Sequence, residues 1–310
     1  MISVVIPLYN KSDSIAKTIK SVQSQSYSDF EIIVVDDGST DDSARIVDGI
    51  HSSEPRLILI KKENGGVCSA RNAGILAAHG EFIALLDADD VWGRDYLKEQ
   101  MRLVSDFPDC WMWGVNYGET VCDEIIRDVP TGLPKGFRGV VENYFGISGR
   151  VSDLFCSSSV LVRRSAFDKV GLFDERIKYA EDSDMWFRII ARFPVAFYDK
   201  YMVFYRLDAE NRAQNQHRPL KYFLPFYVDK YSSYKDNQVF YSWIHRWSAQ
   251  HIAQYCFNVK EERMDAVAAA GRLDYEVIPV KYRVLFKSPY YLGKTIYGLI
   301  RFKNSLRKKQ

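Results

Sequence analysis

The first ninety residues alternate between short apolar runs and segments with helical spacing, and this alternation limits the fold more than any other feature. The runs are β-branched or aliphatic and are bounded by turn residues, which is typical of buried strands. They occupy residues 3–8, 31–35, 57–60 and 82–86. Ile15, Ile19 and Val22 recur at helical intervals, which predicts a helix over 12–25. A chain that repeats strand and helix in this way forms a parallel sheet with right-handed crossovers and helices on its faces.

Polar residues follow each of the four predicted strands at the point where the strand ends. They are residues 7–10, 36–37, 64–66 and 87–90. The carboxyl ends of parallel strands meet at one edge of a sheet, and ligands bind at that edge in α/β folds. Four polar strand ends at one edge are explained better by a binding site than by four separate turns.

The fourth strand end carries three carboxylates, because Asp87, Asp89 and Asp90 directly follow the apolar run 82–86. Burying an isolated charge is costly, so these side chains are expected where the strand leaves the sheet. Asp87 and Asp89 are suited to bind one hard cation, which takes oxygen ligands. On these residues alone, an acidic turn that ends the strand explains the pattern equally well. Asp90 is expected at most to cap the next helix.

Glycine-rich phosphate-binding loops are missing from the first half of the chain. No Gly-x-Gly-x-x-Gly follows the first predicted strand, and Gly65-Gly66 lacks the Lys-Ser/Thr of a phosphate loop. A bound nucleotide would therefore be held by carboxylates and loops. The same observation argues against a nucleotidyltransferase, which would need a glycine-rich basic loop after the first strand.

Beyond residue 90 the pattern is less regular. We expect a helix at 94–105, a strand at 111–117, a long irregular connection at 123–150 that is a candidate acceptor loop, a strand at 155–162, a helix from 181, and two short strands within 195–206. Past 217 the chain becomes helical and rich in aromatic residues. This predicts two domains, an α/β domain at 1–210 and a helical region at 211–310.

Composition places the chain among globular proteins, with 47% hydrophobic and 26% charged residues out of 310. The five cysteines lack metal or redox spacing, which indicates free thiols in a reducing compartment. No signal peptide is evident, and no apolar run reaches the roughly 18 residues that a transmembrane helix needs. We therefore expect a cytoplasmic protein.

The C-terminal tail differs in charge from the rest of the chain. Residues 281–310 hold nine Lys or Arg and no Asp or Glu, whereas the remainder holds 33 basic and 40 acidic residues. Within 284–310, aromatic and aliphatic residues alternate with basic ones, which favours peripheral contact with an anionic membrane surface. A helix packed on the body or on another subunit, as in a homo-oligomer, is the alternative. The acidic body argues against nucleic acid as a partner.

Five blocks of sequence together resemble the family 2 inverting glycosyltransferases of the GT-A fold. They are VVIPLYN at 4–10, VVDDGSTD at 34–41, NGG at 64–66 with ARN at 70–72, LDADD at 86–90, and EDSDMWFR at 181–188. Each block is weak by itself, but all five occur in the order of the family. The resemblance covers about residues 1–206 and implies a Rossmann-like, mostly parallel sheet flanked by helices, with a helical C-terminal extension.

The resemblance implies a UDP-sugar donor, a Mn²⁺ or Mg²⁺ ion, and an acceptor that is a saccharide or lipid-linked. Asp87 and Asp89 match the metal-binding Asp-x-Asp motif. Asp182 matches the general base, and Glu181 is its catalytic neighbour. The remaining positions that match donor-binding residues are Pro7 and Tyr9 at the nucleobase, Asp36 or Asp37 at the uracil N–H, Arg71 near the base or diphosphate, and Asn64, Gly66 and Ala88.

The sequence departs from some relatives after Arg206, where they place a histidine. Leu207 and Asp208 follow here, so the resemblance supplies no third protein ligand to the metal. The family also implies a role in surface polysaccharide synthesis (lipopolysaccharide, capsule or exopolysaccharide) at the inner face of a bacterial membrane. The alternative is a sugar-nucleotide-binding or scaffold subunit that has lost catalysis, which the intact Asp87, Asp89 and Asp182 argue against.

Overall fold

The computed structural model describes residues 1–121, 124–128, 131–147, 154–210, 219–259 and 261–307. It divides into two compact units, residues 1–216 and 217–310, which we describe separately. The domain boundary expected after residue 210 adjoins residues 211–218, which lie outside the described residues. The last residues of the basic tail, 308–310, also lie outside them.

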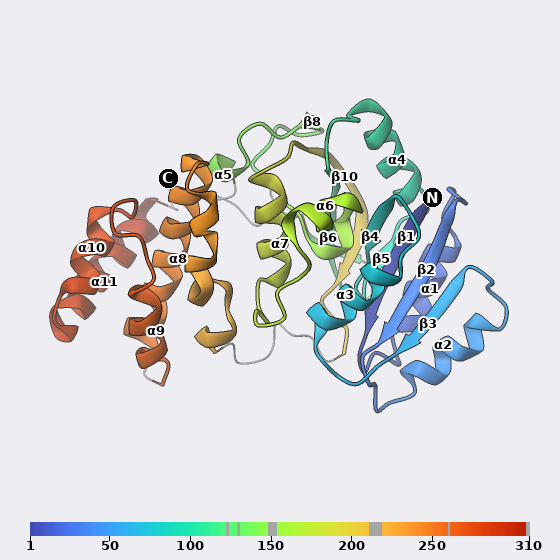
Figure 1. Cartoon of the computed structure of the whole chain (residues 1–310), viewed down its shortest axis with the longest axis horizontal. Helices are drawn as coiled ribbons and strands as arrows, with labels where there is room; N and C mark the ends of the chain where they lie inside the picture. Colours follow the sequence, from blue (N-terminus) through green and yellow to red (C-terminus); the bar gives the residue numbers. More distant parts are fainter. Residues whose placement is uncertain (122–123, 129–130, 148–153, 211–218, 260, 308–310) are drawn as a thin grey trace. The chain divides into compact units, whose positions relative to one another are not determined.

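The first half of the N-terminal unit is a parallel βα repeat (Figure 1). Its elements are β1 (Ile2–Leu8), α1 (Ile15–Gln23), β2 (Phe30–Asp36), α2 (Ser43–His51), β3 (Leu57–Lys61), α3 (Val67–Ala77) and β4 (Phe82–Leu85). The strands lie in the order β3-β2-β1-β4 and all pair in parallel. The predicted strands and helices of this half are therefore confirmed, as is the α/β class.

In the residues described for this unit, the second half extends the same sheet to ten strands, in the order β3-β2-β1-β4-β9-β6-β10-β5, with β7 beside β6 and β8 beside β10. Its elements are β5 (Val91–Trp92), α4 (Tyr96–Asp106), β6 (Met112–Val121), β7 (Glu124–Asp128), β8 (Arg138–Val140), α5 (Tyr144–Ile147), η1 (Ser157–Ser159), β9 (Val160–Arg163), α6 (Ser165–Val170), α7 (Glu181–Ile190) and β10 (Val195–Arg206). β9 runs antiparallel to β4 and β6, whereas β10 runs parallel to β6.

Three local predictions in this half were wrong. The connection at 123–150 is not wholly irregular, because β7 pairs with β6 and β8 pairs with β10; residues 123, 129–130 and 148–150 lie outside the described part. The strand expected at 155–162 begins only at Val160, because Cys156 and Ser159 bond to each other's backbone and form a 3₁₀ turn. The two strands expected within 195–206 are one strand, whose register with β6 shifts between Tyr198 and Val203.

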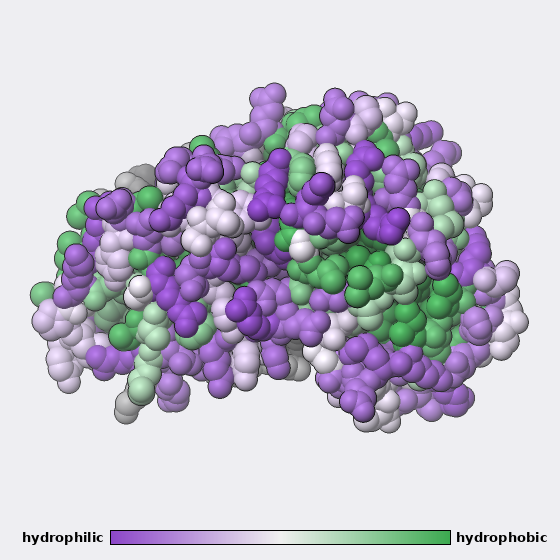
Figure 2. All heavy atoms as spheres, in the orientation of Figure 1, coloured by the Kyte–Doolittle hydropathy of each residue, from purple (hydrophilic) through white to green (hydrophobic). Residues whose placement is uncertain are grey.

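Helices cover both faces of the parallel half. Ile15, Ile19 and Val22 of α1 lie in one apolar cluster with Ile32 and Val34 of β2. The opposite face carries α3, whose Asn72 holds Phe173 by bonds of 3.0 and 2.9 Å. Figure 2 shows apolar side chains gathered over β3 and α3 on the face in view.

Gly74 lets α3 approach the sheet closely, and we expect Gly74→Ala to destabilise the protein. A Cβ at this position would lie 2.3 Å from Val5 Cγ1, so the helix or β1 must move. Overpacking of this kind costs about 1–3 kcal/mol. In α2, Gly49→Ala is the matched control, since a Cβ there meets nothing within 4 Å. Urea unfolding should show a lower midpoint for Gly74→Ala only; equal midpoints for both variants would contradict the close approach.

The C-terminal unit is helical in its described residues, as predicted. Its elements are η3 (Leu220–Tyr222), η4 (Leu224–Tyr234), α8 (Gln238–Asn258), α9 (Arg263–Ala270), α10 (Val280–Lys287) and α11 (Tyr290–Arg307). Edge-to-face contacts of Phe240 with Tyr231 and Tyr234, each at 5.3 Å, build part of its core. None of the described helices is both long and apolar enough to cross a membrane.

Candidate active site

The end of β2 holds the loop that precedes α3. Asp37 is buried, and its carboxylate accepts the N–H groups of Gly65 at 3.0 Å and Gly66 at 2.7 Å. The ammonium group of Lys62 binds the same carboxylate at 2.6 Å. Gly66 adopts φ 89°, in the left-handed region that favours glycine. Asp37 therefore fixes the 64–66 loop, and Asp36 is the neighbouring carboxylate at the strand end.

The loop after β1 is hydrogen-bonded to the turn that follows β2. Asn10 Oδ1 accepts the N–H of Thr40 at 2.8 Å, and the Asn10 N–H donates to Ser39 Oγ at 3.1 Å. Pro7 is buried, whereas Tyr9 is 46% exposed. The structure thus brings the first three polar strand ends together and leaves the Tyr9 ring open to a ligand.

Arg71 joins two groups of acids that lie about 100 residues apart in the sequence. Its side chain is 3% exposed. Nη2 donates to Asp87 Oδ1 at 2.8 Å, and Nη1 donates to Glu181 Oε1 at 2.9 Å. The sequence predicted both acid groups and Arg71 as site residues, but not that Arg71 connects them. Arg71 is therefore a buried residue of α3 and not a solvated one.

The first turn of α7 presents Glu181 and Asp182 beside Arg71. Ala180, the residue before the helix, has φ 59°. Among the described residues, Asn10 and Ala180 are the non-glycine residues with positive φ, and both border the site. Backbone conformations of this kind cost free energy and cluster at functional sites.

Burial raises the pKa of both carboxyl groups at the start of α7. Burial, reinforced by the neighbouring Asp182 charge, raises the pKa of Glu181 to about 7, and Arg71 opposes the rise. Burial also raises the pKa of Asp182, although the Arg71 charge and the Ser183 N–H lower it. A carboxylate with a raised pKa is a stronger proton acceptor, which suits a general base.

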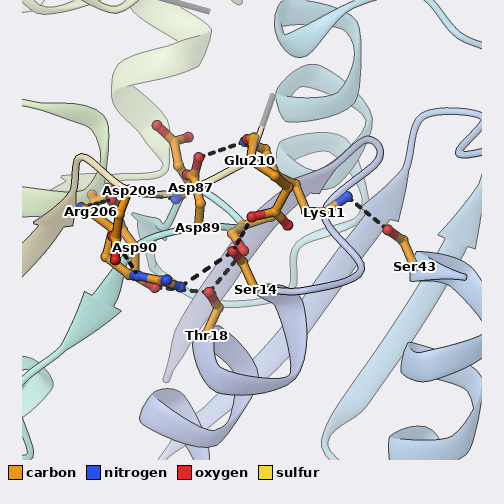
Figure 3. Close-up of polar contacts among 12 residues, drawn as sticks. Lys11, Ser14, Thr18, Ser43, Asp87, Asp89, Asp90, Arg206, Asp208 and Glu210 are labelled. Carbon is orange, nitrogen blue, oxygen red and sulfur yellow. Dashed lines mark hydrogen bonds and ion pairs between the residues drawn. The ribbon is translucent and has the colours of Figure 1, made fainter. Parts of the chain in front are cut away.

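On the other side of the site, Lys11 neutralises Asp89 (Figure 3). Lys11 Nζ donates to Asp89 Oδ2 at 2.7 Å and to the backbone carbonyl of Glu210. The Glu210 carboxylate accepts from Ser14 Oγ at 2.7 Å, and Arg206 Nη1 also donates to Ser14 Oγ at 3.3 Å. These contacts hold the turn after β10 against the loop after β1, next to the Asp-x-Asp motif.

Asp90 has a structural position in the fold. It is buried, and its carboxyl group accepts from Ser158 Oγ at 2.5 Å and from the Arg206 N–H at 3.3 Å. Burial and the charges of Asp89 and Asp87 raise the pKa of Asp90 well above its usual value. The expectation that Asp90 caps the next helix was wrong, since Asp95 occupies that position at α4.

Asp87 and Asp89 fit a divalent cation that takes its other ligands from a bound molecule. Arg71 occupies Oδ1 of Asp87 and Lys11 occupies Oδ2 of Asp89, so each carboxylate keeps a second oxygen for a metal. Among the described residues, no group of three His, Cys, Asp or Glu is arranged to hold a metal. Mg²⁺ commonly binds one or two carboxylates together with substrate phosphates. The donor set therefore suits a metal–phosphate complex better than a free ion.

Lys11 competes with any cation for Asp89, so we expect the Lys11→Met variant to bind Mn²⁺ more tightly than the unmodified protein. The expected gain in affinity is about tenfold, which corresponds to the free energy of one hydrogen bond to a charged group. Titration of Mn²⁺ alone, followed by electron paramagnetic resonance, measures this affinity. Lys62→Met is the matched control, because its ammonium binds Asp37 at 2.6 Å instead. Weaker or unchanged Mn²⁺ binding in Lys11→Met would show that Lys11 does not compete.

Sequence reasoning missed four residues that build this site. They are Lys11, Lys62, Ser158 and Glu210. Lys11 follows the end of the first strand and Lys62 follows the end of the third, beside strand ends whose acids were identified, so a search for counter-charges at the neighbouring ends could have found them. Glu210 and Ser158 carry no such signal, because their contacts arise from pairing within the second half of the sheet.

The chain matches the family model described as glycosyl transferase family 2 over residues 3–171. An uncharacterized glycosyltransferase of Rickettsia prowazekii is 28% identical over 221 residues, which is 70% of this chain and 68% of that protein. A second such protein, from Rickettsia felis, is 27% identical, but the match spans only 35% of its length.

Two further proteins carry more specific names. The Escherichia coli protein WfaP, named UDP-Glc:alpha-D-GlcNAc-diphosphoundecaprenol beta-1,3-glucosyltransferase, is 30% identical over 62% of this chain and 71% of its own. TarS of S. aureus, solved in complex with UDP, matches 100% of this chain and 92% of its own with a TM-score of 0.74 and 18% identity. The likeness to TarS establishes a shared fold.

Proposed function

Because the chain belongs to glycosyl transferase family 2, we propose that it transfers a sugar from a UDP-sugar to an acceptor hydroxyl with inversion of configuration. The acceptor is a saccharide or a lipid-linked saccharide. The WfaP name contains a UDP-sugar donor and a lipid diphosphate acceptor, and TarS was solved with UDP and with UDP-GlcNAc. These names support the donor and acceptor classes proposed for this chain.

The observation that carries the proposal is the link through Arg71 between Asp87 and Glu181, at 2.8 and 2.9 Å. Inverting transfer needs a leaving-group side and an acceptor side on opposite faces of one sugar. Asp87 and Asp89 supply carboxylates for the first, and Asp182 supplies one for the second. A single guanidinium that touches both groups keeps them at a fixed separation.

The proposed reaction is a single displacement at the anomeric carbon. The acceptor hydroxyl attacks, its proton passes to Asp182, and the nucleoside diphosphate leaves on the opposite face. Asp87 and Asp89 would hold Mn²⁺ or Mg²⁺, which supplies charge stabilisation of the leaving diphosphate. Glu181 and Arg71 position the base: the Arg71 charge keeps Asp182 ionised more readily than its burial alone would allow.

The nucleoside would lie along the ends of β1, β2 and β4. The exposed Tyr9 ring is a stacking surface for a base beside Pro7, and Asp36 is the strand-end carboxylate proposed to accept the uracil N–H. Asp37 is proposed to act mainly through the loop it holds. The donor-binding set is completed by Asn64, Gly66, Arg71 and Ala88.

The pathway that fits this chemistry is synthesis of a bacterial surface polysaccharide, on an acceptor presented at the inner face of the membrane. Thermal unfolding in a panel of UDP-sugars with Mn²⁺ tests the donor, since a ligand stabilises the folded state by mass action. We expect one UDP-sugar to raise the melting temperature more than UDP does. A panel in which no uridine nucleotide shifts the melting temperature would overturn the proposal, and donor hydrolysis separates an enzyme from an inactive binding subunit.

A further inference from the structure

Helix α11 has apolar side chains on two opposite sides. Only one of these sides packs against another helix of the same unit. The inner side is covered, because Tyr290 and Tyr297 stack on Phe257 at 6.0 and 5.6 Å. Gly293 lies so close that a Cβ there would be 3.0 Å from the Phe257 ring. The helix is thus fixed on the unit along this side, and its opposite side faces outward.

The outward side of α11 is formed by Tyr291, Leu292, Thr295 and Leu299, which we call the outer face. Residues 291, 295 and 299 repeat at intervals of four, so they lie on one side of the helix. Tyr291 is 83%, Leu292 56% and Leu299 66% exposed. Thr295 Oγ1 donates to the Tyr291 carbonyl at 3.1 Å, so its polar group is satisfied within the helix. An exposed helix normally turns charged residues to water on this side.

Positive charge lies along one flank of α11. Lys294 and Arg301 are exposed and are spaced from Tyr297 by three and four residues, so they lie on the flank between the inner side and the outer face. No Asp or Glu occurs in 281–310, where nine residues are Lys or Arg. A second copy of this chain would bring like charges together at this face, and an anionic surface would bring opposite ones.

A cationic guanidinium also lies beside the start of α11. A cavity of about 230 Å³ is lined by residues of α8, α9, α10 and α11, among them Arg263, Val267 and Tyr290. The Arg263 guanidinium lies 3.6 Å from the Tyr290 ring centroid. Val267 at the cavity is 61% exposed. Because Tyr290 belongs to the inner side of α11, this guanidinium adds positive charge to the unit but is not part of the outer face.

We propose that the outer face of α11 binds the surface of an anionic lipid bilayer, with Tyr291, Leu292 and Leu299 among the acyl chains and Lys294 and Arg301 at the lipid phosphates. The helix lies along the membrane and does not cross it. The inference deepens the proposed function, since it would carry the enzyme to a lipid-linked acceptor. Its test needs no donor, so it stands or falls separately from the chemistry.

Co-sedimentation of the full chain with vesicles tests the proposal. We expect binding to vesicles that contain phosphatidylglycerol, little binding to pure phosphatidylcholine, and release at high salt. The variant Leu292→Glu/Leu299→Glu should lose vesicle binding. Lys294→Gln/Arg301→Gln should reduce the partition coefficient about 25-fold, since each basic residue contributes about fivefold at an anionic surface. Val239→Glu is the matched control, because Val239 of α8 is 63% exposed outside this face.

Three results would overturn the membrane assignment. The first is equal binding to both kinds of vesicle, and the second is full vesicle binding by Leu292→Glu/Leu299→Glu. The third is light scattering in which the unmodified chain is a dimer and this variant is a monomer. The last result would assign the face to a second copy. Turnover on a soluble acceptor without vesicles should stay unchanged in the same variant. If neither the unmodified chain nor any variant showed turnover, that result would count against the proposed function and not against membrane binding.

Discussion

Replacing Asp182 by Asn is expected to reduce turnover by about 10²–10⁴-fold, the usual contribution of a positioned general base. An amide cannot accept the acceptor proton, yet it has the same shape and keeps an oxygen for the Ser183 N–H, which now bonds Asp182 Oδ1 at 2.6 Å. Donor binding should therefore remain within a few-fold of the unmodified protein. Product formation in steady state, with UDP affinity from calorimetry, separates the two effects.

The control for Asp182→Asn is Asp168→Asn, which changes an exposed acid in the first turn of α6. It reproduces the loss of a helix-terminal charge without touching the site, and its turnover should be normal. The base acts when deprotonated, and burial raises the Asp182 pKa. Turnover should therefore rise with pH and level off above that raised pKa. Near-normal turnover in Asp182→Asn, with the fold intact, would show that another group takes the proton.

The parallel half of the fold was predictable because its signals are local. Each strand is an uninterrupted apolar run and each crossover is a single helix, so order and handedness follow from general rules. The convergence of strand ends follows as well, and Asp37 bound to Gly65 and Gly66 is an instance of it. The match in fold with TarS confirms both the α/β class and the expected GT-A fold.

The second half was harder because long-range pairing overrides local preference there. Ser158 reads as the polar centre of a strand, but its Oγ donates to Asp90 and its carbonyl accepts from Trp92 Nε1 at 2.7 Å. β10 reads as two strands, because the exposed turn-like residues near 199–201 interrupt its apolar pattern. The pairing of basic and acidic side chains also depends on the tertiary structure. Nothing near Arg71 in the sequence indicates that it binds Glu181, which is 110 residues away.

Replacing Asp89 by Ala is expected to abolish the part of UDP binding that depends on Mn²⁺. A divalent cation at a leaving diphosphate contributes several kcal/mol, so the affinity in Mn²⁺ should fall about 10²-fold or more. Asp89 supplies one of the two proposed carboxylate ligands. Its loss also removes the carboxylate that Lys11 binds at this motif, whereas the bond from Lys11 to the Glu210 carbonyl remains. Calorimetric titration of UDP with and without Mn²⁺ measures the effect.

The comparison that decides the role of Asp89 is between metal-free and metal-loaded titrations. In excess chelator the unmodified protein and Asp89→Ala should bind UDP about equally, because a ligand of the metal matters only when the metal is present. If Asp89 acted only through its charge, its removal would strengthen binding of the anionic diphosphate under both conditions. The double variant Lys11→Met/Asp89→Ala removes that charge effect, since it deletes both partners of the 2.7 Å pair. Unchanged UDP affinity with Mn²⁺ in Asp89→Ala would exclude this carboxylate as a metal ligand and would leave Asp87, already bound to Arg71, as the remaining acid of the motif for that role.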